Sequence, residues 1–159
     1  MARSEDREKV PLSKAAEYLL EECRMVLPGI QALFGFQLIA VFNDGFHDRL
    51  TSVEQNLHLL AIGLIAVAVA IIMTPAAYHR QHNPQEVTET FITVSTRLLL
   101  WSMLPLAVAI SLDFYIIARI IVHQALSAVL GAALFGVFVL LWFVFPRSRR
   151  LQRLVHGRR

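Results

Sequence analysis

Four apolar runs, each long enough to cross a lipid bilayer as a helix, constrain this chain more than any other feature. They cover residues 27–46, 57–78, 98–122 and 125–145. A bilayer core of about 30 Å needs roughly 20 helical residues, and a chain in lipid must satisfy its backbone hydrogen bonds internally. The composition agrees, because 56% of the residues are hydrophobic and only 17% are charged. We therefore predict an all-α polytopic membrane protein, whose four transmembrane helices form one antiparallel bundle over residues 27–146.

A helix of a different kind is predicted before the first run. Between residues 12 and 26 the apolar side chains recur at intervals of three, four and seven, and charged side chains occupy the other face. This pattern is typical of an amphipathic interfacial helix, and we expect Pro28-Gly29 to end it on the cytoplasmic side. Residues 1–11 are predicted to be a disordered tail, and residues 147–159 a basic cytoplasmic tail.

The third run is predicted to begin as a helix before it reaches the membrane. The segment Asn83-Pro84-Gln85-Glu86 offers an N-cap, a proline at the first helical position and a glutamate at the third. That helix would extend roughly 20 Å into the cytoplasm at about 1.5 Å per residue. Pro105 lies inside it and is expected to cause a bend.

The distribution of positive charge predicts the orientation. With both termini in the cytoplasm, thirteen of the fifteen Lys and Arg residues lie on the cytoplasmic side, and only Arg49 and Arg119 lie outside. No cleavable signal precedes the first run, so we expect a multi-pass protein of the bacterial inner membrane. The basic tail lacks interleaved aromatic residues, which favours contact with anionic lipid over binding of nucleic acid.

Several classes of function lack sequence support. The chain has one cysteine and no Cys/His cluster, so structural zinc, iron–sulfur and disulfide scaffolds are not indicated. Hydrolase and protease motifs and a phosphate-binding glycine loop are missing as well. We expect no enzyme, no metal and no cofactor. His58 and His123 leave a weak haem alternative, although both are more simply explained as caps at the membrane surface.

Polar residues inside the runs are candidates for an ion pathway, because ionisable groups are costly in a membrane. Asp44 and Asp113 are predicted to share a layer near the outer face, where Asp113 could instead form a plain ion pair with Arg119 or Arg49. Gln37 falls near the midplane and needs a partner. It either forms an interhelical hydrogen bond or lines a pore or cavity.

Small residues spaced by four suggest close helix packing, within the chain or between copies. They are Ala66 and Ala70 in the second run, and Ala128, Ala132 and Gly136 in the fourth. Four spans enclose little space for a permeation route, so we expect a homo-oligomer.

Two motifs resemble a family of small bacterial four-span membrane proteins of unknown function, some members of which are labelled sodium:proton antiporters. The first motif is Glu22-Cys-Arg24-Met-Val-Leu-Pro-Gly29-Ile-Gln31-Ala-Leu-Phe34, and the second is Pro75-Ala-Ala-Tyr-His79-Arg80. Both motifs fall on the predicted cytoplasmic side. Six residues could converge there, either as a functional cluster or as an ion-pair lock: Glu22, Arg24, Gln31, His79, Arg80 and Arg97.

The resulting hypothesis is an oligomeric ion channel or ion-coupled transporter for a proton or another small inorganic cation. Gating by pH through His79 is part of this hypothesis, because imidazole titrates near neutral pH. If Glu22 belongs to a partly buried ion pair, Glu22→Gln should be more damaging than Glu17→Gln. The alternative is a non-transporting scaffold or accessory subunit of a partner complex.

Overall fold

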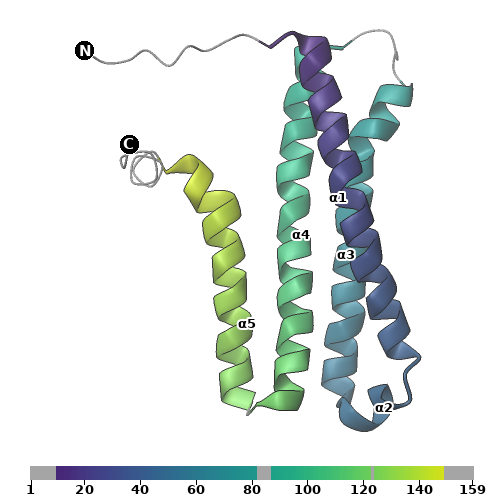
Figure 1. Cartoon of the computed structure of the whole chain (residues 1–159), viewed down its shortest axis with the longest axis vertical. Coiled ribbons are helices and arrows are strands. Elements are labelled where there is room, and N and C mark those ends of the chain that lie inside the picture. Colours follow the sequence, from purple (N-terminus) through teal and green to yellow (C-terminus); the bar gives the residue numbers. More distant parts are fainter. Residues whose placement is uncertain (1–9, 82–86, 123, 149–159) are drawn as a thin grey trace.

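The computed structural model describes residues 10–81, 87–122 and 124–148, and in these residues it is all helical. Four long helices run alternately up and down (Figure 1). They are α1 (Leu12–Val41), α3 (Ser52–Gln81), α4 (Glu89–Ile121) and α5 (Gln124–Val139), and the short α2 (Gly45–Arg49) lies between α1 and α3. A π-helical turn (Leu140–Val144) and a 3-10 turn (Phe145–Arg147) extend α5. Four helical segments are long and apolar enough to cross a membrane: α1, α3, α4, and α5 together with its extension to Arg147. This finding confirms the predicted fold class.

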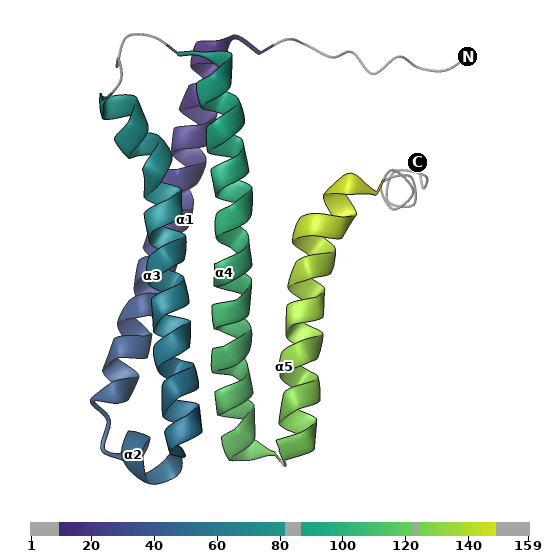
Figure 2. The same ribbon diagram turned by 180° about the vertical axis from the view of Figure 1, so that it is seen from behind.

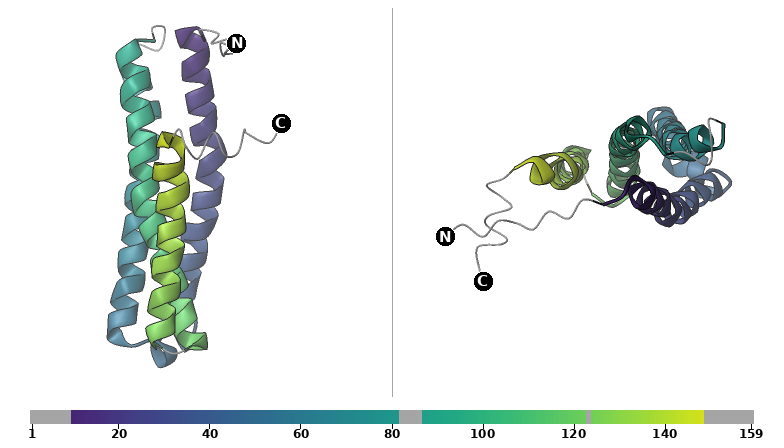
Figure 3. Two further views of the ribbon diagram at one scale, coloured as in Figure 1. Left: turned by 90° about the vertical axis from the view of Figure 1, so that its left-hand side faces the viewer. Right: turned by 90° about the horizontal axis from the view of Figure 1, so that it is seen from above.

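The two ends of the bundle differ in what they contain. We call the end that carries α2 and the α4–α5 connection the α2 end, and the opposite end the termini end (Figure 1). Helices α1, α3 and α4 form a three-helix cluster, and α5 stands beside α4 outside it (Figure 3). Seen from behind, α5 diverges from α4 toward the termini end (Figure 2).

The most extensive contact is the one between α3 and α4. The buried side chains of α3 recur at alternating intervals of four and three, which places them on one face. They are Glu54, His58, Ala61, Ile65, Ala68, Ile72 and Pro75. On α4 the buried residues Ser95, Ser102, Ala109 and Ile116 recur every seven positions. Since most of these side chains are small, the two helix backbones can approach closely.

Helix α5 packs through a different pair of small residues from the strip that its sequence predicts. Ser127 and Gly131 are buried, and a Cβ atom added at Gly131 would lie 3.1 Å from the Cβ of Tyr115 on α4. The predicted strip of Ala128, Ala132 and Gly136 is exposed instead. Within the chain, α4 therefore meets Ser127 and Gly131, and packing of the predicted strip between copies stays a prediction.

Helix α1 continues through Pro28-Gly29, so the predicted break at this point is wrong. Residues 12–26 and the first part of the predicted span form one 30-residue helix with Pro28 inside it. Cys23 and Ile30 are buried on either side of the proline in the same hydrophobic core. Packing on both sides therefore keeps the helix continuous through a proline, which removes one backbone hydrogen bond, as transmembrane helices tolerate.

Other boundaries also differ from the predicted ones. Helix α1 ends at Val41, so Asp44 lies in the link before α2 and outside the first long helix. Helix α4 begins at Glu89, where the Thr88 hydroxyl caps it by accepting a hydrogen bond from the Phe91 N–H, and it continues across Pro105. The predicted start at 83–86, His123, and the tails over 1–9 and 149–159 lie outside the described residues.

Candidate ion-binding site

A cavity of about 670 Å³ lies at the α2 end, bordered by α1, α2, α3 and α4. Most of its wall is apolar, with side chains such as Leu33 and Ile116. Five polar residues also line it: Gln37, Asn43, Arg49, His58 and Asp113. A largely apolar cavity with a few converging polar groups is the usual form of a small-ligand site.

Asp113 is the central acid of this cavity. It lies on α4, and its side chain is 16% exposed. The side-chain amide of Gln37 on α1 donates a hydrogen bond to Oδ2, and Nδ1 of His58 on α3 lies 3.3 Å from Oδ1. Three helices therefore bring one residue each to a shared site, which we call the Gln37–His58–Asp113 cluster.

His58 contacts Gln37 as well as Asp113. Its Nε2 lies 3.0 Å from the backbone carbonyl oxygen of Gln37, four residues before the end of α1. Its ring packs against Phe46 of α2, with ring centroids 5.4 Å apart. Both ring nitrogens thus face protein oxygens, which leaves neither free for the haem ligation considered above.

Two oxygen atoms of the cluster are buried without a hydrogen bond. They are Oε1 of Gln37 and Oδ1 of Asp113. Oδ1 lies within ion-pair distance of His58, but the pair does not have the alignment of a hydrogen bond. A buried acceptor without a donor is costly, so Oδ1 of Asp113 has capacity to bind a proton or a cation, and Oε1 of Gln37 has capacity to accept a hydrogen bond or contact a cation.

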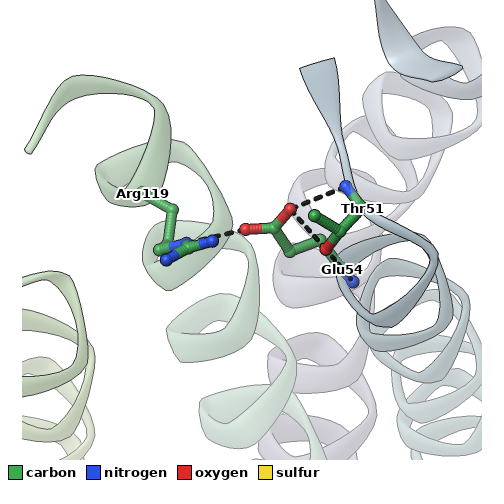
Figure 4. Close-up of polar contacts among 3 residues, drawn as sticks. All are labelled: Thr51, Glu54 and Arg119. Carbon is green, nitrogen blue, oxygen red and sulfur yellow. Dashed lines mark hydrogen bonds and ion pairs between the residues drawn. The ribbon is translucent and has the colours of Figure 1, made fainter. Parts of the chain in front are cut away.

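A part-buried ion pair lies next to the cluster, between α3 and α4 (Figure 4). Glu54 lies one helical turn before His58, and its Oε1 accepts a hydrogen bond from Nε of Arg119 at 2.7 Å. Its Oε2 accepts from the Thr51 N–H and the Thr51 hydroxyl, both at 2.8 Å. The Glu54 N–H donates to the Thr51 hydroxyl oxygen at 3.4 Å, which completes a reciprocal capping box at the start of α3. Glu54 thus joins the start of α3 to the end of α4.

These contacts decide between the alternatives that the sequence left open at this end. The predicted interhelical hydrogen bond of Gln37 is confirmed, and Gln37 also lines the cavity. Asp113 pairs with His58, and Arg119 pairs with Glu54, so the predicted Asp113–Arg119 pair is wrong. Asp44 is exposed and does not line the cavity.

At the termini end, the six residues predicted to converge do not form a cluster of contacts among the residues that the structure describes. Glu22, Arg24, Gln31, Arg80 and Arg97 are exposed, and among the residues that the structure describes none of them forms an ion pair. The partly buried His79 ring lies 5.6 Å from the ring of Phe91. The α3–α4 contact here is aromatic, because Tyr78 also stacks on Phe91 at 6.0 Å.

Sequence reasoning missed Glu54 and misjudged His58, although a signal for both was present. The pattern Thr51-x-x-Glu54 before an apolar run is a capping-box signature. The four-and-three spacing of residues 61, 65, 68, 72 and 75 in α3 also extends back through His58 to Glu54, which places both on the same helix face. Only the partner helix, and so the identity of each contact, lay beyond the sequence.

The chain matches a known family over residues 5–146. That family carries the description "Family of unknown function (DUF6328)", and the match does not confirm an antiporter label. No curated protein matches the chain. No solved structure matches it either. The match spans all four long helices and the whole Gln37–His58–Asp113 cluster, and the chain therefore belongs to the DUF6328 family.

Proposed function

We propose that this protein moves a proton or another small cation across the membrane, and that the Gln37–His58–Asp113 cluster binds the ion. The observation that carries the proposal is the Asp113 carboxylate, which lies inside a membrane-spanning helix with one buried oxygen that lacks a hydrogen bond. A charge in that position costs free energy, and such residues in membrane proteins commonly mark ion pathways.

The arrangement of cavities favours coupled transport over an open pore through one copy. A second cavity, of about 620 Å³, lies at the termini end and is lined by Glu22, Tyr18 and Ser102 among mostly apolar residues. Along α4 it reaches Leu106, and the α2-end cavity begins at Asp113. These positions are about 10 Å apart at about 1.5 Å per residue.

The segment between the cavities is tightly packed. Ala61, Ile65 and Ala68 of α3 and Ala107 and Ala109 of α4 are completely buried. An ion bound at Asp113 therefore needs a change in helix packing before it can reach the second cavity. Alternating access from two cavities is the transport mode that this geometry supports.

Association of several copies is part of the same proposal. The strip of Ala128, Ala132 and Gly136 is exposed beside the α4–α5 contact, where Ala128 and Ala132 border a groove of about 340 Å³, and a Cβ atom built at Gly136 meets nothing within 4 Å. A second copy could approach α5 closely along this strip. Cross-linking in membranes through cysteines placed at Ala132 tests this: efficient disulfide formation supports it, and its failure under oxidising conditions opposes it.

The test of function is ion flux in vesicles of phosphatidylethanolamine and phosphatidylglycerol that contain the purified protein. We expect a flux of protons, sodium or potassium that falls at least tenfold in Asp113→Asn. Asp44→Asn is the matched control, because Asp44 is exposed and outside the cavity, and it should keep the wild-type flux. Equal flux in the wild type, Asp113→Asn and protein-free vesicles would remove the transport proposal and favour the scaffold.

A further inference from the structure

The tautomer of His58 follows from its contact with the backbone of Gln37. Nε2 of His58 faces the carbonyl oxygen of Gln37 at 3.0 Å, and a carbonyl oxygen can only accept. Nε2 must therefore carry a hydrogen. In a neutral imidazole only one nitrogen carries a hydrogen, so Nδ1 then has a lone pair.

That lone pair lies close to another acceptor. Nδ1 lies 3.3 Å from Oδ1 of Asp113, the oxygen that has no hydrogen bond. With neutral His58 and ionised Asp113, the two would repel each other in a buried site. One proton added between them removes the repulsion, either as imidazolium beside carboxylate or as imidazole beside carboxylic acid.

We propose that the ion held by this cluster is a proton, shared between Nδ1 of His58 and Oδ1 of Asp113. The inference rests on the proposed function and names its substrate. Binding adds one proton and takes the pair from a net charge of −1 to zero, and release reverses the change. Gln37 positions both partners, because its carbonyl sets the tautomer of His58 and its amide holds Oδ2 of Asp113.

The surrounding charges fit a site that carries either no charge or one negative charge. Arg49 of α2 lines the cavity and is the cation available to stabilise the deprotonated pair. Glu54 of α3 and Arg119 of α4 neutralise each other beside the cluster. His47 of α2 and His58 both contact the ring of Phe46, with ring centroids 5.4 Å apart in each pair. The polar cavity residues of α1 and of the link after it are the neutral Gln37 and Asn43, and the chain carries no charged residue between 125 and 145.

A metal cation fits the same atoms less well. Hard cations bind six or more oxygen atoms, commonly including several carboxylates. Here the amide nitrogen of Gln37 and the ring of His58 occupy two sides of the Asp113 carboxylate. Among the residues that the structure describes, no group of three His, Cys, Asp or Glu side chains could hold a metal ion.

The first test measures the proton at equilibrium, in full-length protein in lipid. Histidine labelled with ¹⁵N is followed by solid-state NMR from pH 4 to 9, and loss of one signal set in His58→Gln identifies His58 among the six histidines. Infrared spectra follow the Asp113 carboxyl group, which Asp113→Asn identifies. We expect Nε2 of His58 to carry hydrogen at every pH.

We also expect the Nδ1 and Asp113 signals to change together in the wild type. In each single variant the remaining partner should titrate at a midpoint displaced by about one pH unit or more, as expected of coupled groups. A neutral His58 with hydrogen on Nδ1 overturns the inference, and so do midpoints that the variants leave unchanged. If His58→Gln fails to fold, single variants of the other five histidines identify the His58 signal by elimination, so the tautomer can still be read from the wild-type spectra.

The second test separates this inference from the proposed function. Proton flux is measured with a pH-sensitive dye inside the vesicles, and sodium and potassium fluxes are measured at constant pH. A shared proton in the spectra without flux of any ion supports the inference and removes the transport function. Sodium or potassium flux that is lost in Asp113→Asn, with no movement of protons, keeps the transport function and overturns the inference.

Discussion

The two ends of the bundle use charged residues in opposite ways. At the α2 end, Glu54, Arg119, His58 and Asp113 pair between α3 and α4, and Glu54 is only 5% exposed. At the termini end, Glu22, Arg24, Arg80 and Arg97 are exposed and form no ion pair among the described residues, and the contacts between α3 and α4 there include the ring pairs of Tyr78 and His79 with Phe91. The helix face on which a charge lies, rather than its distance from an apolar run, decides whether it becomes buried and paired.

The packing of α5 against α4 also differs between the two ends of the bundle. It contacts α4 closely near Ser111 and Tyr115, toward the α2 end. Toward the termini end, a cavity of about 420 Å³ separates Arg97 and Trp101 of α4 from Phe143 in the π-helical turn that extends α5. The α2 end is therefore expected to be the more stable part of the bundle, because its helices are joined by both charge pairs and close contacts.

The largest loss of stability is expected from Glu54→Gln. The change leaves Arg119 without its carboxylate partner and weakens the reciprocal cap at the start of α3. The apparent melting temperature in detergent should fall by several degrees. Glu22→Gln is the control from the termini end, where no described ion pair is lost, and it should behave like Glu17→Gln. Equal melting temperatures for Glu54→Gln and Glu22→Gln would contradict the contrast between the ends.

A smaller effect is expected from Gly131→Leu. Its side chain would begin 3.1 Å from the Cβ of Tyr115, and over-packing of this kind costs about 1–3 kcal/mol. Gly136→Leu tests the same helix five residues later, where a Cβ atom meets nothing within 4 Å. It should leave the unfolding of a single copy unchanged. Thermal unfolding of both variants in detergent makes the comparison, and a larger loss for Gly136→Leu would oppose the packing described here.

The N-caps of α3 and α4 allow a finer comparison between the ends. Thr51 and Thr88 each accept a hydrogen bond from the N–H group three residues later, but only Thr51 also binds a buried glutamate. Loss of an N-cap costs about 0.5–2 kcal/mol. We expect Thr51→Ala near the upper value and Thr88→Ala near the lower one. Chemical unfolding of the two variants measures the difference, and the reverse order would show that the network around Glu54 adds no stability.

The sequence predicted the helices better than it predicted the site, for a physical reason. Apolar length determines which segments span a bilayer, and this property is local, so four spans and their antiparallel order could be read directly. The partner of a buried charge depends on the rotation of two helices about their axes. Asp113 could reach Arg119 or Arg49 as judged from spacing, and only the packed structure places His58 beside it.

The break predicted at Pro28-Gly29 was a local prediction, and packing against the other helices overrode it. Local propensity argued for a helix end there, whereas burial of Cys23 and Ile30 against the other helices overrides it. The same contacts bury Leu19 and leave Glu22 exposed. A mistaken local boundary thus led to a mistaken expectation for the charges beside it.

The smallest effect is expected from His79→Gln, which tests the pH gate predicted from sequence. His79 contacts the ring of Phe91, and among the described residues it forms no ion pair, so protonation there changes no charged contact. His58 instead touches the one carboxylate within the cluster. Flux measured from pH 5 to 8 should therefore follow the wild-type profile in His79→Gln and depart from it in His58→Gln. If His79→Gln changes the pH dependence of flux and His58→Gln does not, the pH response belongs to the termini end. Exposed charges at that end would then act on transport although they are not paired in the structure.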